Sequence, residues 1–116
     1  MPFDATPVET RAQRDLRILR LSRQAIAARG GWHKGGLGDP GISMCVIGWL
    51  HHIGWAEGDR DYEVLARRLL WPALPWRWRV FRDFWSLAQF NDAPWRRQKR
   101  IVKLYTLAIR LAERRL

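Results

Sequence analysis

Residues 42–53 constrain the fold more than any other segment, because they are apolar around almost the whole circumference of a helix. Ser43 or Asp39 supplies an N-cap for this helix, and Gly54 ends it. A helix that is apolar on all sides is stable only when neighbouring elements cover it. We therefore expect a buried central helix built on the apolar residues Met44, Cys45, Val46, Ile47, Trp49 and Leu50.

Four other segments carry helical signals, and no segment predicts a strand. Residues 8–29 contain no Pro or Gly and stop at Gly30-Gly31. The sequence predicts an all-α protein, a compact single-domain bundle of about five helices over residues 1–116, with 1–7 as a flexible N-terminus. The first and last helices are expected to pack against the central one. The remaining helices are predicted from an N-cap at Asp59 or Asp61 to Trp71, from Pro75 to Ala88, and from Trp95, capped by Asp92, to Arg115.

A glycine-rich segment, residues 30–41, separates the first two predicted helices. It contains six glycines and is expected to be a loop that packs Trp32 beneath it. It lacks the Gly-Lys-Ser/Thr ending and the preceding strand of a nucleotide-binding P-loop. Inside the central helix, Gly48 costs about 1 kcal/mol relative to alanine, which indicates that it permits a close helix crossing.

The chain is strongly basic. It has 21 Lys and Arg against 11 Asp and Glu, which gives a formal net charge of +10. Residues 94–116 hold eight basic residues and a single acid, Glu113. Such an excess informs on partners rather than on fold, and it favours a polyanion: nucleic acid, an anionic membrane surface or an acidic protein surface. The alternative is a solvated basic face without a partner.

The chain also has eight tryptophans. Trp49, Trp55 and Trp85 lie on or beside apolar faces and are expected in the core. Trp76 and Trp78 instead alternate with arginines. They could stack nucleobases while the guanidinium groups bind phosphates, or lie at a lipid headgroup boundary. Alternatively, the arginines cover the rings through cation–π contacts.

Cys45 is the only cysteine, which excludes a disulfide framework and favours a reducing compartment. As a nucleophile it would need a nearby base, and the candidates are His33 and His52. On an ideal helix, Cys45 and His52 lie about 10 Å apart along the axis, too far for direct proton transfer. A buried Cys in an apolar helix is usually an inert small hydrophobe, so no catalytic residue is assigned.

No metal and no cofactor is predicted. A zinc site built from His33, Cys45 and His51 or His52 lacks the recurrent ligand spacing. The longest apolar stretch, residues 44–50, is far shorter than the roughly 18 residues of a membrane span, and the opening segment has no apolar signal-peptide core. We expect a cytoplasmic protein without a transmembrane segment.

Three short motifs follow one another in order. They are GWHKG at 31–35, MCVIG at 44–48, and NDAP at 91–94 with an Ile-Val pair at 101–102. Together, over about residues 12–112, they resemble an uncharacterised family of small helical proteins from actinobacteria and their phages, a domain of unknown function. The resemblance implies a helical fold and brings no activity with it.

The resemblance has two departures. Phe90 stands where the family has Trp, and Arg97 stands where a Thr cap would be expected, so the last helix is expected to start nearer Asp92. The positions that carry the family pattern, called signature residues below, are Trp32, Gly35, Cys45, Gly48, Asn91 and Asp92.

These features predict a non-catalytic, small basic accessory or regulatory protein that binds a polyanion, with nucleic acid or a nucleoprotein complex as the favoured partner. No DNA-reading motif is present, so binding is expected to tolerate sequence and to weaken with salt. The residues expected to bind phosphates are Arg96, Arg97, Lys99, Arg100 and Lys103, and Trp95, Trp76, Arg77, Trp78 and Arg79 are expected to contact the partner beside them.

Three alternatives stay open. One is a protein-interaction module, such as a phage or mobile-element inhibitor of a host protein, anchored by exposed tryptophan edges. Another is a small enzyme that uses Cys45, and the weakest is a role at a membrane surface. The sequence also leaves open the oligomeric state, and whether Asn91 and Asp92 do more than cap a helix.

Overall fold

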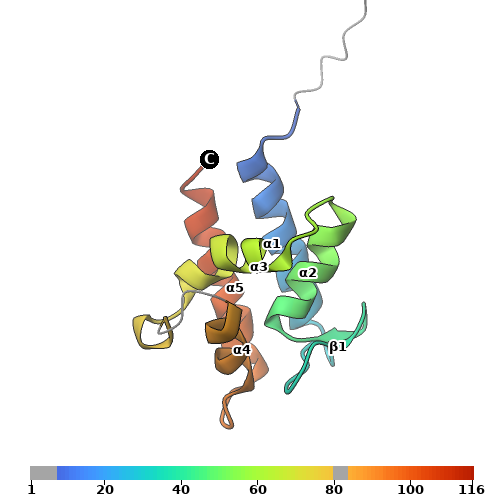
Figure 1. Ribbon diagram of the computed structural model, residues 1–116, viewed down its shortest axis with the longest axis vertical. Helices are drawn as coiled ribbons and strands as arrows, with labels where there is room; N and C mark the ends of the chain where they lie inside the picture. Colours follow the sequence, from blue (N-terminus) through green and yellow to red (C-terminus); the bar gives the residue numbers. More distant parts are fainter. Residues whose placement is uncertain (1–7, 80–83) are drawn as a thin grey trace, which may run out of the picture.

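The computed structural model describes residues 8–79 and 84–116, which fold into five α-helices and one very small sheet (Figure 1). The predicted all-α class is confirmed. The expected flexible N-terminus, 1–7, and positions 80–83 of the predicted fourth helix lie outside the described residues. The elements are α1 (Arg11–Ala27), β1 (Gly38–Asp39), β2 (Ser43–Met44), α2 (Val46–Ala56), α3 (Tyr62–Leu65), α4 (Phe84–Asp92) and α5 (Gln98–Glu113).

Helix α1 begins at Arg11, three residues later than expected, because Thr10 forms a capping box there. Thr10 Oγ1 accepts a hydrogen bond from the Gln13 N–H at 3.1 Å, and Gln13 Oε1 accepts one from the Thr10 N–H at 2.8 Å. Two sides of α1 are covered, since it packs lengthwise against α5 and also against α2 (Figure 1). The apolar residues of α1 that this packing buries are Leu16, Ile18, Leu19 and Ile26.

Helix α2 begins at Val46, four residues later than expected, and continues past Gly54 to Ala56. Cys45 is its N-cap, and the Cys45 Sγ accepts a hydrogen bond from the Gly48 N–H at 3.3 Å. All five residues from 46 to 50 are buried, whereas the second half of the helix is partly exposed. The expectation of a buried central helix therefore holds for its first half.

The residues just before α2 form a hairpin that the sequence did not indicate. Strands β1 and β2 are antiparallel, with Gly38 opposite Met44 and Asp39 opposite Ser43. Gly38 has a φ of +90°, and a Cβ added there would lie 2.1 Å from the Ser43 carbonyl oxygen. The hairpin occupies positions where the central helix was expected to begin, and Gly41, with φ +73°, lies in the turn between its two strands.

Helix α5 packs mainly along α1 and along residues 66–73, rather than on α2 as expected. It reaches α2 through Tyr105, whose fully buried hydroxyl donates to the Val46 carbonyl oxygen at 2.5 Å. At the start of α5, the Gln98 side chain donates to two carbonyl oxygens at the end of α1, at 2.8 and 2.9 Å. These contacts join α5 to the end of α1 and to the start of α2.

The third predicted helix is present, but its geometry changes along its length. Asp61 is its N-cap, as one of the two alternatives proposed, and accepts the Glu63 and Val64 N–H groups at 3.1 and 3.2 Å. Helix α3 then continues into a π-helical turn, η1 (Ala66–Leu70), and a 3-10 turn, η2 (Trp71–Ala73). Proline inside η2 cannot donate a helical hydrogen bond, so the segment ends there.

The fourth and fifth helices begin at other residues than the sequence predicted. Pro75 leads into a 3-10 turn, η3 (Trp76–Trp78), and the helix itself is described from Phe84. Asp92 was expected to cap the last helix, which is wrong: it is the last residue of α4, and α5 begins at Gln98. The N-cap of α5 is Arg97, whose side chain makes no capping hydrogen bond.

The three tryptophans expected in the core have different outcomes. Trp49 is buried, and its Nε1 donates to the Gly31 carbonyl oxygen at 2.6 Å. Trp55 is 47% exposed near the end of α2, with the Arg60 guanidinium 4.2 Å from its ring centroid, so that prediction is wrong. The side chain of Trp85 lies outside the described part of the structure.

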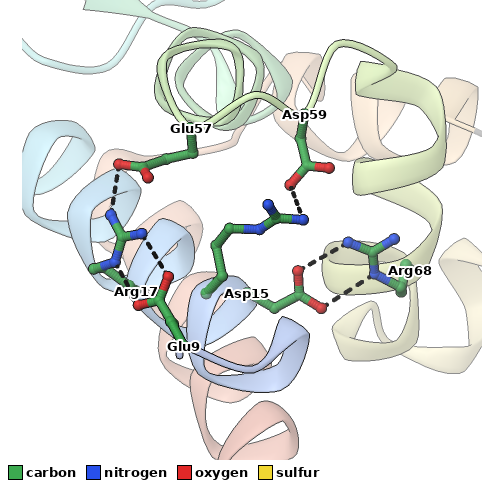
Figure 2. A network of polar contacts seen from close by, with 7 residues as sticks. Glu9, Asp15, Arg17, Glu57, Asp59 and Arg68 are labelled. Carbon is green, nitrogen blue, oxygen red and sulfur yellow. Dashed lines mark hydrogen bonds and ion pairs between the residues drawn. The ribbon is translucent and has the colours of Figure 1, made fainter. Parts of the chain in front are cut away.

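Ion pairs fasten α1 to the turn that follows α2 (Figure 2). Arg17 pairs with Glu9 at 2.7 Å and with Glu57 at 2.5 Å, and Arg14 pairs with Asp59 at 3.5 Å. The hydrogen bonds from Arg17 lower the pKa of both glutamates. This network engages acidic side chains at the end of the molecule where α1 begins.

A less exposed pair joins α1 to η1 (Figure 2). Asp15 is 6% exposed, and its two oxygens accept hydrogen bonds from Arg68 at 2.8 and 3.2 Å. Bidentate contacts of this kind are the strong form of an ion pair. Asp15 and Arg68 are 53 residues apart, so the pair fixes the third segment against the first helix.

The substitution Asp15→Ala is expected to lower the free energy of unfolding by about 2 kcal/mol, because Arg68 then stays half-buried without its carboxylate partner. Urea denaturation followed by circular dichroism measures the change. Asp39→Ala, which removes an exposed carboxylate, serves as the control and should cost less than about 0.5 kcal/mol. Equal losses in the two variants would contradict this role for Asp15.

Candidate functional site

The side-chain amide of Asn91 lies at the centre of a buried hydrogen-bond cluster. Asn91 is 1% exposed and sits at the end of α4. Its Oδ1 accepts from Trp32 Nε1 at 2.8 Å and from the Val46 N–H at 3.1 Å. Its Nδ2 donates to the His33 carbonyl oxygen at 3.1 Å and to Asp92 Oδ1 at 2.8 Å. The four hydrogen-bonding positions of the amide are thus filled, and one side chain joins α4, the glycine-rich loop and the start of α2.

The other signature residues surround this amide. The Gly35 N–H donates to Asp92 Oδ1 at 2.8 Å, and Gly35 has a φ of +90°. Gly48 admits the loop rather than a second helix, since a Cβ added there would lie 2.9 Å from the Leu37 carbonyl oxygen. With Cys45 capping α2 beside them, the six signature residues meet in one place. We call them, with Val46, the Asn91 cluster.

Cys45 belongs to this cluster as a cap, and its environment opposes catalysis. The residue is buried, and burial raises the pKa of its thiol. A nucleophilic cysteine needs a lowered pKa and access to substrate. Within the described residues no hydrogen bond joins Cys45 to either candidate base, and His52 packs edge-on against Trp49 at 5.8 Å between ring centroids.

Two further features bear on ligands and membranes. In the described ranges, no group of three or more His, Cys, Asp or Glu side chains is placed to hold a metal ion. The described helices also include none that is both long enough and apolar enough to cross a membrane.

The substitution Asn91→Ala is expected to lower the free energy of unfolding by about 3 kcal/mol, because it leaves the Trp32 indole N–H and the Val46 N–H buried without acceptors. Asp92→Ala, at an exposed carboxylate, should cost about 1 kcal/mol. Chemical denaturation of both variants measures these losses. If Asn91→Ala is no more destabilising than Asp92→Ala, the amide does not have the central role that its geometry indicates.

Stability should also fall at alkaline pH. Burial raises the pKa of the Cys45 thiol and, well above its ordinary value, that of the Tyr105 hydroxyl. As the pH rises, the unfolded chain loses these two protons at a lower pH than the folded protein does. Their contribution to the free energy of unfolding is therefore complete below about pH 8.5 and falls progressively above it. Denaturation at neutral pH and near pH 10 should show a larger loss for the natural chain than for Cys45→Ala. An equal pH dependence of the two proteins would contradict the burial effect.

The predicted partner-binding residues gather around a pocket of about 440 Å³ between η3 and the first half of α5. The two segments are about twenty positions apart in the sequence, so the fold is what brings them together. An adjoining hollow of about 360 Å³ adds Arg97 and Lys99. Six of the predicted residues line the pocket itself: Arg77, Trp78, Trp95, Arg96, Arg100 and Lys103.

One wall of the pocket is held by contacts within the protein. The Trp78 and Phe90 rings meet edge-on at 5.5 Å between centroids. The Arg96 guanidinium lies 3.8 Å from the Phe90 centroid and 5.3 Å from that of Trp78, and its Nε donates to the Phe90 carbonyl oxygen at 2.7 Å. The cation over the Trp78 ring is thus Arg96, from outside the Arg-Trp alternation, and Arg96 contributes both to the wall of the pocket and to its positive charge.

The other cations around the pocket form no ion pair with the acidic side chains of residues 8–79 and 84–116. All of them are exposed. Desolvation, and then repulsion from Arg100, lower the pKa of Arg96, which stays charged because arginine ordinarily titrates above pH 12. An anion placed between these groups would relieve their repulsion. The exposed set consists of Arg77, Arg97, Lys99, Arg100 and Lys103.

Two predicted residues do not line either hollow. Trp76 is 82% exposed and stands outside the pocket. Arg79 closes its own turn, where Nε donates to the Leu74 carbonyl oxygen at 2.7 Å and Nη2 to that of Pro72 at 2.9 Å. Its guanidinium lies 5.7 Å from the Trp71 ring centroid, and not over either of the tryptophans with which it alternates in the sequence.

Sequence reasoning missed the apolar floor of the pocket. A signal for part of it was present, because Leu104 and Leu107 follow Arg100 and Lys103 at four-residue spacing and so share their face of α5. The remaining floor residues come from other elements and could be placed only by the fold. The apolar lining consists of Ala73, Pro75, Phe90, Leu104 and Leu107.

The residues that carry the Asn91 cluster lie within a region, 10–111, that matches a known protein family. The chain belongs to DUF6197, a family of unknown function. This membership confirms the resemblance drawn from the signature residues, and the DUF6197 region includes all the pocket residues as well. No curated protein and no solved structure matches the chain.

Proposed function

We propose that this DUF6197 member is a non-catalytic, cytoplasmic accessory or regulatory protein that binds a polyanion, with nucleic acid or a nucleoprotein complex as its partner. The observation that carries the proposal is a group of exposed cations around one apolar pocket, none of which forms an ion pair within the part of the chain that the structure describes. We call this surface the pocket face; it comprises Arg77, Trp78, Trp95, Arg96, Arg97, Lys99, Arg100 and Lys103.

The distribution of ion pairs supports this location. Glu9, Glu57 and Asp59 are engaged with arginines near the start of α1 (Figure 2). On α5 itself, Glu113 lies at the opposite end from the pocket face and pairs with Arg20 at 3.8 Å. The positive potential of the pocket face is therefore not cancelled by these acids, and it would attract a polyanion over a Debye length of about 8–10 Å.

The chemistry of the pocket face favours sequence-tolerant binding. Arginine and lysine side chains that contact phosphates fix position without reading sequence. Exposed Trp95 supplies an aromatic surface, and aromatic stacking also tolerates any base.

A second candidate function rests on the exposed tryptophans. Trp76 is 82% and Trp95 71% exposed, and tryptophan is enriched among the residues that dominate protein interfaces. A protein partner with an acidic surface would suit both the rings and the charge. The small-enzyme alternative has less support, because the Cys45 thiol is buried and its pKa is raised.

Fluorescence anisotropy tests the main proposal directly. The protein is titrated into a labelled oligonucleotide of about 15 nucleotides at salt concentrations between about 50 and 200 mM. Contacts to four or five phosphates predict a log–log slope of about −3 for a single strand, at roughly 0.7 per phosphate. No binding at the lowest salt would overturn the proposal, and salt-insensitive capture by a protein partner would favour the second candidate.

A pair of matched variants locates the site. Arg100→Ala with Lys103→Ala should weaken binding and make the salt slope shallower by about 1.4, because two phosphate contacts are lost. Arg11→Ala with Arg115→Ala removes the same charge from a hollow that both residues line together with Ala112, at the other end of α5. That control should leave the slope nearly unchanged. Equal effects of the two pairs would show that net charge, rather than the pocket face, determines binding.

A further inference from the structure

We propose that the pocket takes an unpaired nucleobase, so that the protein's polyanion is single-stranded nucleic acid. This inference rests on the proposed function and narrows it from polyanions in general to one chemical class. It is carried by the combination of an apolar pocket and a cationic rim, which fits a flat apolar group attached to a phosphate.

The shape of the site supports a bound group rather than surface charge alone. The pocket volume of about 440 Å³ falls within the range of roughly 300–1,000 Å³ that is typical of small-molecule sites. Its floor is apolar, with Leu104 buried and Leu107 37% exposed. Arg100 and Lys103 precede these leucines on the same face of α5, so phosphates could lie at the rim while a base lies on the floor.

The wall of the pocket is built before any ligand arrives. Trp78, Phe90 and Arg96 hold one another through the edge-on ring contact, the two cation–π contacts and the hydrogen bond to the Phe90 carbonyl oxygen. Trp95, in contrast, is 71% exposed at the rim. A preorganised wall with one free ring beside it is suited to stacking a base, since little order has to be gained on binding.

The pocket should prefer single-stranded over duplex nucleic acid, because only a single strand offers an unpaired base. In a duplex each base is stacked and paired, and extruding one costs free energy. Charge alone would favour the duplex, which carries about one phosphate per 1.7 Å of its axis. A preference for the single strand would therefore have to come from the pocket.

The experiment compares four polyanions of equal length by fluorescence anisotropy. The three nucleic-acid ligands are labelled and titrated directly, and the fourth, a polypeptide, is added as an unlabelled competitor. The four are a single strand of thymidines, the same strand without its bases, the duplex of thymidines with adenosines, and poly-glutamate. We expect the thymidine strand to bind at least about five-fold more tightly than the abasic strand and more tightly than the duplex.

Equal binding of thymidine and abasic strands would overturn this inference and leave the polyanion proposal intact. If poly-glutamate competes as well as the thymidine strand, the inference is overturned in favour of an acidic protein. Binding of none of the four would overturn both proposals.

Two variants separate the pocket from general charge. Trp95→Ala should weaken binding of the thymidine strand at least about five-fold and leave abasic binding unchanged. Trp76→Ala removes an equally exposed ring outside the pocket and should change neither. Leu107→Trp fills the pocket without altering charge and should act like Trp95→Ala. Equal effects of Trp95→Ala and Trp76→Ala, or unchanged thymidine binding by Leu107→Trp, would overturn the inference. Circular dichroism verifies that each variant is folded.

Discussion

The hydrogen bonds of the Asn91 amide join the end of α4 to the glycine-rich loop and to the start of α2. The loop that they tie down is rich in glycine and has few apolar side chains to bury, so its position depends on polar contacts. The same amide accepts the Val46 N–H, one of the groups that a helix leaves unsatisfied at its start. A side chain from α4 thus fixes the start of α2 and the path of the loop together with the Cys45 cap and the backbone hydrogen bonds of the hairpin.

The Asn91 cluster and the pocket face are linked through neighbouring residues. Asn91 enters the cluster, while Phe90, one position earlier, contributes its ring to the pocket wall and its carbonyl oxygen to Arg96. On the far side, Lys34 of the loop donates to the Pro94 carbonyl oxygen at 3.0 Å, just before Trp95. The cluster thus positions the segment that presents Trp95 and Arg96. This gives the signature residues a structural role and leaves recognition to the side chains around the pocket.

Much of the fold could be predicted from the sequence because its signals are local. The buried half of α2 follows from a continuous apolar run, and Asp61 caps a helix that begins at the next residue. The start of α2 could not be predicted, since the hairpin before it depends on contacts across the loop, such as the Met44 N–H with the Gly31 carbonyl oxygen at 3.0 Å. Asp92 looked like a cap because its partner, the Gly35 N–H, is 57 residues away.

The candidate site was predictable in part for the same reason. The cations of the basic face of α5 come from one continuous segment of the sequence, so they could be identified together. The pocket was not predictable, because its lining combines η2, η3, α4 and α5. Arg79 shows the converse case: its place in an Arg-Trp alternation suggested a phosphate contact, whereas its hydrogen bonds close the turn.

The most direct test of the account is a nitrogen–proton NMR spectrum of the protein, recorded with and without a single-stranded oligonucleotide. The indole N–H signals distinguish the two parts of the structure, since those of Trp32 and Trp49 are hydrogen-bonded within the fold and Trp95 stands at the pocket rim. We expect shifts for the Trp95 indole and for the amides of Arg96 to Leu104, with the Trp32 and Trp49 signals unmoved. Shifts centred on Trp32 and the glycine-rich loop, or no shifts at all, would contradict it.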